Sequence, residues 1–296
     1  MNSENQHPHE PVLLEETVSA LVTDKDGVYL DCTIGFGGHS SKILERINKT
    51  GKLYGIDFDP YALEYSNNRL SKSEGSFELF LSNYTELKNL LLSKKVEEVS
   101  GILFDLGISS YQVDSGYKGI SYRTDSPLDM QLDEKTGVNI KDFLYDSSEE
   151  EIANTIYNNS EEGNSRKIAK SITQNIRDDK MKTNLDLVNA IKEVTPERFL
   201  NKTLSRVFQS FRITANNELS NILDSIIQAM HLLKPKGRLA VITFHSIEDR
   251  LVKNIFRSFS RGNKSYLENM DCWISCECRK IIKILTKKPI RPNRHE

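Results

Sequence analysis

The sequence predicts an α/β fold with a parallel sheet that is interrupted by a small all-helical insert. Short apolar runs alternate with helical patterns between residues 28 and 106, and a further strand pattern follows at residues 238–244. Between residues 147 and 194 the chain is polar, almost free of strand-like runs, and carries successive helix signals. Alternating strands and helices are typical of parallel sheets, so the polar stretch is expected to be an insertion.

Five segments have the short apolar pattern of buried strands, and helical spacing follows the first two of them. A glycine-rich turn at residues 35–38 separates the first strand from a helix over 40–47, and Pro60 precedes a helix over 61–70. The expected strands are residues 28–33, 52–56, 77–81, 101–106 and 238–244.

Helix signals continue through the insert and beyond it. Ser148 and Glu151 match a capping box, and isoleucines recur every four residues from 168 to 176. An amphipathic helix over 219–233 is expected to end at the turn Lys234-Pro235-Lys236-Gly237. These changes predict three segments, which are a first part of the α/β domain (1–134), a helical insert domain (135–205), and a second part with a basic C-terminal segment (206–296).

Composition is ordinary for a globular protein, with 38% hydrophobic and 28% charged residues among 296. No apolar run has the length of a membrane span, and the polar first ten residues lack the apolar region of a secretory signal. A protein of the cytoplasm, or at most of an organelle matrix, without membrane partners is therefore expected. The four cysteines predict reduced thiols, and the spacing of Cys272, Cys276 and Cys278 matches no usual zinc pattern. No metal is therefore expected.

The net charge of −2 conceals a strong asymmetry along the chain. Residues 250–296 contain twelve Lys and Arg against four Asp and Glu, a net charge of +8, so residues 1–249 carry −10. Clusters of Lys and Arg gain affinity for phosphate backbones by releasing counterions. The asymmetry indicates either a polyanionic partner such as RNA or a solvated basic tail.

The glycine loop after the first strand, with Gly35, Gly37 and Gly38, is a candidate cofactor site. It places backbone N–H groups and little bulk at the carboxyl edge of the sheet. A dinucleotide fingerprint that starts at Gly35 and Gly37 would need a third glycine where Ser40 stands. S-adenosylmethionine has no phosphate, so Gly37 and Gly38 would let the backbone approach its methionine end. Asp57 follows the second strand, where an acid accepts both ribose hydroxyls. Loop and acid together favour S-adenosylmethionine over a nicotinamide cofactor.

Two further segments are expected at the same edge of the sheet. Asp105 ends the fourth strand and is followed by the hydroxyls of Ser109 and Ser110, which indicates a substrate site or a turn bonded to its own backbone. After the fifth strand, Phe244 precedes His245 and Ser246, so a ring, an imidazole and a hydroxyl could hold a flat base.

The segment around His245 has a second interpretation, because residues 248–250 have the pattern of a helix start. We therefore expect His245, Ser246 and Arg250 to contact the substrate, without a role for His245 as general base. Residues 115–133 form a long irregular run that is typical of functional or disordered segments, and Arg123 and Asp129 within it are further candidates for substrate contacts.

Motifs distributed over nearly the whole chain resemble one family. They are His9-Glu10-Pro11-Val12-Leu13-Leu14, Gly35-Phe36-Gly37-Gly38-His39-Ser40, Asp57-Phe58-Asp59-Pro60, Asp105-Leu106-Gly107-Ile108-Ser109-Ser110-Tyr111-Gln112, Pro127-Leu128-Asp129-Met130, Phe208-Gln209 with Asn217-Glu218-Leu219, and Phe244-His245-Ser246-Ile247-Glu248-Asp249-Arg250. They resemble the ribosomal RNA small subunit methyltransferase H family, whose members methylate N4 of a cytidine in 16S ribosomal RNA. The resemblance implies a class I S-adenosylmethionine-dependent methyltransferase sheet (Rossmann-like) with a helical domain inserted between the fourth and fifth strands.

The resemblance also implies a set of cofactor contacts, with the ring of Tyr84 near the adenine. The implied residues are Gly37, Gly38, His39, Asp57, Tyr84, Asp105 and Gln112. The resemblance further implies that the family continues beyond the position of Glu296 into an Asn-Pro-Arg-rich tail. If that tail contacts RNA or the cofactor, a chain without it is expected to be less active.

The predicted function is S-adenosylmethionine-dependent methylation of a cytidine N4 amine in 16S ribosomal RNA within the small subunit. Asp105 and Ser109 are the candidates for accepting hydrogen bonds or a proton from that amine. One alternative is a methyltransferase of the same fold that acts on DNA amines, although residues 105–109 lack the Pro-Pro-aromatic run usual there. Another is an RNA-binding ribosome-assembly protein with little or no catalysis. The sequence also leaves open whether the protein forms a homodimer.

Overall fold

The computed structural model describes residues 11–108, 117–132, 137–263, 280–286 and 288–292. The chain divides into two compact units, which are considered separately below. The sheet unit comprises residues 1–107 and 220–296, and the helical unit comprises residues 108–219.

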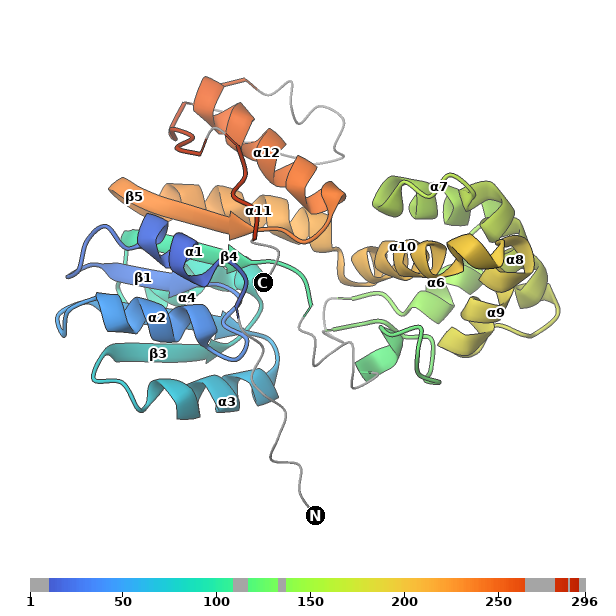
Figure 1. The fold of residues 1–296 in the computed structure, drawn as a ribbon, viewed down its shortest axis with the longest axis horizontal. Helices are drawn as coiled ribbons and strands as arrows, with labels where there is room; N and C mark the ends of the chain where they lie inside the picture. Colours follow the sequence, from blue (N-terminus) through green and yellow to red (C-terminus); the bar gives the residue numbers. More distant parts are fainter. Residues whose placement is uncertain (1–10, 109–116, 133–136, 264–279, 287, 293–296) are drawn as a thin grey trace, which may run out of the picture. The chain divides into compact units, whose positions relative to one another are not determined.

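The sheet unit contains a five-stranded parallel sheet in the order β3-β2-β1-β4-β5 (Figure 1). All five expected strands are present. Their bounds are β1 (Val28–Asp31), β2 (Lys52–Asp57), β3 (Ser76–Leu81), β4 (Val99–Asp105) and β5 (Leu233–Ile242). In a doubly wound sheet of this order, ligands bind outside the carboxyl ends of the strands, where the order reverses between β1 and β4.

Helices cover both faces of this sheet (Figure 1). On one face lie α1 (Leu14–Leu21), α2 (Gly38–Arg46) and α3 (Pro60–Leu70), whose apolar sides enclose Tyr29, Leu53 and Leu103 of the strands. On the other face lie α4 (Leu87–Ser93), after the short 3-10 helix η1 (Tyr84–Glu86), and α11 (Glu218–Leu232). The last described helix, α12 (Ser246–Arg261), follows β5. Among the described residues of both units, no helix has the length and apolar character that crossing a membrane requires.

The start of β5 differs from expectation. The sequence predicts a turn at residues 234–237 before a strand over 238–244, but β5 begins at Leu233, directly after α11. Val99 of β4 pairs with Leu233, and Gly101 pairs with Arg238, so the residues between them bulge out of the register. The residues that were expected to form a turn therefore form a bulge in β5. Pairing with β4 on both sides of the bulge holds it in place.

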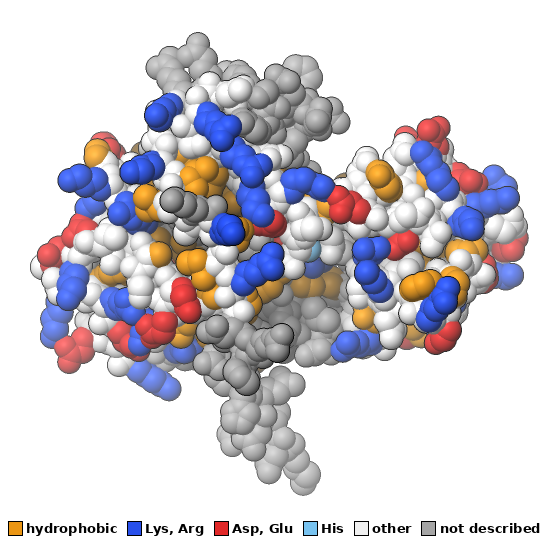
Figure 2. Space-filling model, turned by 45° about the horizontal axis from the view of Figure 1, so that its top comes forward, with side chains coloured by type: hydrophobic (Ala, Val, Ile, Leu, Met, Phe, Trp, Pro, Cys, Tyr) orange, Lys and Arg blue, Asp and Glu red, His pale blue; other side chains and the backbone are white. Residues whose placement is uncertain are grey.

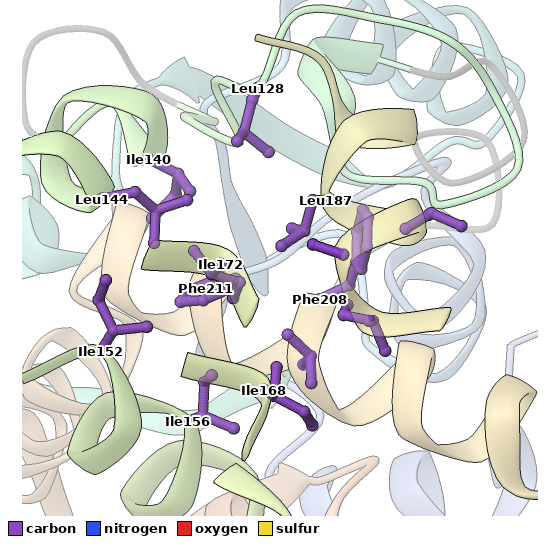
Figure 3. Packing of buried hydrophobic residues seen from close by; sticks show 14 of the residues in the cluster. Leu128, Ile140, Leu144, Ile152, Ile156, Ile168, Ile172, Leu187, Phe208 and Phe211 are labelled. Atoms are coloured by element: carbon purple, nitrogen blue, oxygen red, sulfur yellow. The ribbon is translucent and has the colours of Figure 1, made fainter. Parts of the chain in front are cut away.

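The helical unit is built around one apolar cluster (Figure 3). Side chains such as Ile152, Ile168, Leu187 and Phe211 point toward one another from four different helices. The elements of the helical unit are η2 (Tyr117–Gly119), α6 (Ile140–Asp146), α7 (Glu149–Ser160), α8 (Ser165–Arg177), α9 (Asn184–Val194) and α10 (Glu197–Asn216). The capping box between Ser148 and Glu151 at the start of α7 is present as predicted.

The helical unit begins earlier and ends later than the expected insert at 135–205. The loop before α6 contributes Leu128 to the helical core, and α10 continues as one helix across residues 205 and 206. A compact unit need not coincide with a domain that folds independently, so the expected domain boundaries stay a prediction.

Candidate active site

Three carboxylates end adjacent strands of the sheet unit. Asp31, Asp57 and Asp105 are the last residues of β1, β2 and β4, so all three lie at the carboxyl edge. Sequence reasoning selected Asp57 and Asp105 but missed Asp31. The signal for it was available, because Asp31 is a charged residue at the end of an apolar strand directly before the glycine loop.

Asp57 anchors the glycine loop. Its Oδ2 accepts a hydrogen bond from the backbone N–H of Gly35 at 2.8 Å, and its Oδ1 accepts one from the N–H of Asp59 at 3.0 Å. Burial raises the pKa of Asp57 to about 6, against the opposing effect of these two hydrogen bonds. Two residues predicted to bind the cofactor, Gly35 and Asp57, are thus in direct contact.

The glycine loop requires a left-handed backbone at Gly37. Gly37 has φ +74° and precedes the first residue of α2, Gly38. A Cβ atom at Gly37 would also lie 3.1 Å from Cβ of Ser66, so a side chain there would be both strained and crowded. The loop therefore presents backbone N–H groups at the start of α2 without side-chain bulk.

Asp31 connects the first strand to α2 and to the neighbouring strand end. Its Oδ2 accepts a hydrogen bond from Oγ of Ser40 at 2.7 Å, and its Oδ1 accepts one from the N–H of Thr33. The hydroxyl of Thr33 in turn accepts a hydrogen bond from the backbone N–H of Asp105 at 2.6 Å. Complete burial raises the pKa of Asp31 to about 6.

His39 lies between the N-terminal segment and Asp105. Its Nε2 is 3.2 Å from the carbonyl oxygen of Val12, and its Nδ1 is 3.5 Å from Oδ2 of Asp105. Burial lowers the pKa of His39 to about 4, so the ring is neutral near pH 7. Because a carbonyl can only accept a hydrogen bond, Nε2 carries the hydrogen, and Nδ1 turns a lone pair toward Asp105.

Asp105 can gain or lose a proton near neutral pH. Burial raises its pKa to about 7, and the negative charges of Asp31 and Glu248 act in the same direction. Its side chain is 24% exposed, while its Oδ1 is buried and has no hydrogen-bond partner among the described residues. When Asp105 is protonated it can donate to Nδ1 of His39, and when it is ionised it can accept a proton from a substrate.

Tyr84 lies beyond the end of β3, as the first residue of η1. Its half-buried ring meets the ring of Phe104 edge-to-face, with centroids 5.9 Å apart. Since Phe104 precedes Asp105 in β4, the ring of Tyr84 is held close to the carboxyl edge of the sheet.

The segment after β5 is the start of a helix, which was one of its two interpretations. His245 caps α12, because its Nδ1 accepts a hydrogen bond from the N–H of Glu248 at 3.3 Å. Its Nε2 is 3.1 Å from Oε1 of Glu248 without the alignment of a hydrogen bond. Ser246 and Arg250 are exposed on the first turns of α12.

Two predicted substrate contacts, Arg123 and Asp129, belong to the helical unit. Arg123 is exposed, and its guanidinium lies 5.9 Å from the ring centre of Tyr122. Asp129 is half-buried, and its Oδ1 accepts from Nδ2 of Asn139 at 3.2 Å. Asp129 thus stabilises the loop that leads into α6.

Comparison with known proteins assigns the chain to a family. Residues 6–296 match the model of the MraW methylase family. The chain belongs to this family. It is 40% identical to ribosomal RNA small subunit methyltransferase H of Fusobacterium nucleatum over 284 aligned residues. That alignment covers 96% of this chain and 90% of the relative. The proteins of that name from Brevibacillus brevis (291 residues, 97% and 92% covered) and Mesoplasma florum (293 residues, 97% and 93%) are each 38% identical.

Membership of the MraW methylase family confirms the predicted fold class and the prediction of a methyltransferase that uses S-adenosylmethionine. The carboxyl edge fits this methyl donor. A carboxylate offers about four lone-pair sites, so Asp57 retains acceptors for ribose hydroxyls beyond the two N–H groups it binds. The buried Oδ1 of Asp105 is a further acceptor without a partner among the described residues.

Other predicted residues of this methylase lie outside the described residues. They are the hydroxyl-bearing Ser109 and Ser110, the cofactor candidate Gln112, and the cysteines Cys272, Cys276 and Cys278. The fourth cysteine, Cys32, is buried and reduced, and burial raises the pKa of its thiol.

Proposed function

We propose that this methyltransferase methylates the N4 amine of a cytidine in 16S ribosomal RNA, within the small ribosomal subunit and in the cytoplasm. The observation that carries the proposal is the raised pKa of Asp105 at the carboxyl edge of the sheet. Asp105 is a carboxylate with a pKa of about 7, at the end of β4 and 3.5 Å from His39, which follows the glycine loop. An amine that is methylated must lose a proton, and an acceptor whose pKa is near 7 suits that task.

The cofactor contacts are part of the same proposal. Asp57 would accept hydrogen bonds from the ribose hydroxyls, and the ring of Tyr84 would lie near the adenine. The remaining proposed contacts are Gly35, Gly37, Gly38, His39, Asp105 and Gln112. When bound, S-adenosylmethionine supplies an electrophilic methyl carbon on a positively charged sulfur.

The protein's contribution to the chemistry is orientation and proton transfer. The lone pair of N4 is delocalised into the cytosine ring, so the amine is a poor nucleophile until it is rehybridised and aimed. Asp105, with Ser109 as a second candidate, would accept a hydrogen bond from N4–H and then its proton. A proton on Oδ2 of Asp105 can be shared with the neutral Nδ1 of His39, 3.5 Å away. The residues proposed to contact the RNA substrate are Ser110, Arg123, Asp129, His245, Ser246 and Arg250.

Transfer of labelled methyl from S-adenosylmethionine to unmodified small ribosomal subunits tests the proposal. Nucleosides from the digested RNA are identified by mass spectrometry, and N4-methylcytidine is the expected product. Free 16S ribosomal RNA and cytosine-containing duplex DNA are assayed in parallel. Methylated DNA would indicate the DNA-directed alternative. Tight S-adenosylmethionine binding without transfer to any substrate would favour a non-catalytic RNA-binding protein.

A basic surface on α12 supports RNA as the substrate. Arg250, Lys253, Arg257 and Arg261 recur every three or four residues and share one side of the helix, while the opposite side is buried. The N–H of Ile281 donates to the carbonyl of Phe259 at 3.1 Å, so residues 280–286 pass beside the end of α12. Lys and Arg side chains are visible over this part of the sheet unit (Figure 2). The α12 basic surface comprises Arg250, Lys253, Arg257, Arg261, Lys280 and Lys283.

The double variant Arg257→Ala/Lys283→Ala is expected to bind 16S ribosomal RNA more weakly than the wild type, and with a smaller dependence on salt. Each phosphate contact that is lost should reduce the slope of log affinity against log salt by about 0.7 to 0.9. Affinity for S-adenosylmethionine should not change. Binding is measured by fluorescence anisotropy across a salt series.

The matched control is Lys72→Ala/Lys88→Ala, which also removes two exposed positive charges from the sheet unit but not from α12. An equal loss of slope in both double variants would mean that only net charge matters, and would contradict a defined RNA surface on α12.

A further inference from the structure

Phe244 is a large aromatic residue at the carboxyl edge of the sheet that the protein leaves exposed. Its side chain is 56% exposed, whereas the ring of Phe104, in the neighbouring strand β4, is fully buried. Single exposed apolar residues are common on protein surfaces, so exposure alone indicates nothing. The position of Phe244 is what distinguishes it.

The ring lies against the backbone that follows Asp105. β4 and β5 pair with Asp105 opposite Ile242, so Gly107 and Phe244 are each two residues beyond a paired position. Gly107 has φ +102°, and a Cβ atom there would lie 3.3 Å from Cδ2 of Phe244. A glycine at this position therefore permits both the backbone conformation and the close approach of the ring.

The backbone of Phe244 is held by the start of α12. Its N–H donates to Oε2 of Glu248 at 2.9 Å, and the same oxygen lies 3.4 Å from the N–H of His245. Glu248 is 1% exposed, so this anchor is protected from water. The ring is thus presented from a capped helix start, which restricts its position more than a free loop would.

A flat base that brings an exocyclic amine to Asp105 needs a surface on which to stack. Residues 106–108, which follow the acid directly, include no aromatic side chain. Phe244 supplies a ring at this place from the neighbouring strand. Aromatic side chains bind unpaired bases by stacking, and a base must leave its own stack to enter such a pocket.

We propose that Phe244 is the stacking platform for the target cytosine, and so a substrate-positioning residue that aims the N4 amine at Asp105. This inference rests on the proposed function. It assigns a role to a residue that contributes no polar group to the reaction.

Three variants distinguish stacking on the ring of Phe244 from the effect of its apolar volume alone. Phe244→Ala and Phe244→Leu remove the ring, and Phe244→Leu keeps an apolar side chain, while Phe244→Trp keeps a flat ring. For methyl transfer to small ribosomal subunits, kcat/KM is expected to fall by about 10- to 100-fold in the Ala and Leu variants. In the Trp variant it should stay within about 5-fold of the wild type. The dissociation constant of S-adenosylmethionine should be unchanged in all three. Leu92→Ala, which truncates a side chain that is 47% exposed on α4, is the matched control.

A second measurement does not depend on turnover. An RNA oligonucleotide with one unpaired pyrrolocytosine is titrated with protein, and its fluorescence is expected to be quenched by the wild type and the Trp variant but not by the Leu variant. Quenching without methyl transfer would support Phe244 and count against the proposed reaction. Full activity in the Leu variant, or equal quenching by Leu and wild type, would overturn the stacking role.

Discussion

Replacement of Asp105 by Asn is expected to lower kcat for methyl transfer by about 100- to 10,000-fold. The amide has nearly the shape of the carboxylate but cannot take a proton from the cytosine amine. Steady-state turnover is measured with saturating S-adenosylmethionine and small ribosomal subunits, and cofactor binding is measured separately by calorimetry. Asp224→Asn, an exposed carboxylate on α11, serves as the control. Wild-type turnover in the Asn variant with the cofactor bound would rule out the proposed role.

The pH dependence of turnover provides a second test of Asp105. Its pKa of about 7 is set by burial and by the charges of Asp31 and Glu248, while His39, with a pKa of about 4, is neutral throughout this range. The ionised form accepts the proton, so kcat should rise between about pH 6 and pH 8 and then level off. The residual activity of the Asn variant should lack this rise.

The same variant is expected to be more stable than the wild type at alkaline pH. Because the pKa of Asp105 is raised from its ordinary value of 3.8 to about 7, the folded chain binds more protons than the unfolded chain between these values. The free energy of unfolding therefore falls as pH rises through this window. The melting temperature of ligand-free Asp105→Asn should exceed that of the wild type at pH 8, and by less at pH 5. The opposite trend would contradict the raised pKa.

Replacement of Asp57 by Ala is expected to weaken S-adenosylmethionine binding by about 100-fold or more. The variant loses the proposed ribose acceptors and also the hydrogen bonds from Gly35 and Asp59 that hold the loop. Hydrogen bonds to a charged group contribute about 1.5–3 kcal/mol each, and two of them account for this loss. Isothermal titration calorimetry with S-adenosylmethionine and with its demethylated product measures the effect.

The control for Asp57 lies two residues away. Asp59 caps α3 by accepting from the N–H of Tyr61 at 2.9 Å. Asp59→Ala should therefore destabilise the protein by about 1 kcal/mol, with little change in cofactor affinity. If the two Ala variants bound the cofactor equally well, Asp57 would not be the ribose acceptor.

The local pattern of the sequence was sufficient to predict most of the helices and strands. Pro60 at the start of α3 and the capping box of Ser148 and Glu151 were predicted, because each depends on residues within one helical turn. The prediction was wrong at the start of β5, where the turn signal of Pro235 and Gly237 is a bulge in a strand that β4 pairs. Pairing between strands depends on a partner remote in the chain, which local propensity does not include.

The sequence by itself determined the family motifs, the glycine loop, and the acids Asp57 and Asp105 at strand ends, since these follow from residue type and spacing along the chain. Only the tertiary structure decided which of these groups touch and how they titrate. Gly35 donates to Asp57, Thr33 accepts from Asp105, and Phe244 lies over Gly107. The pKa of Asp105 rises to about 7 because folding buries it near Asp31 and Glu248. Burial and Coulomb interactions depend on distances in space, and the parallel sheet sets those distances by bringing remote strand ends to one edge.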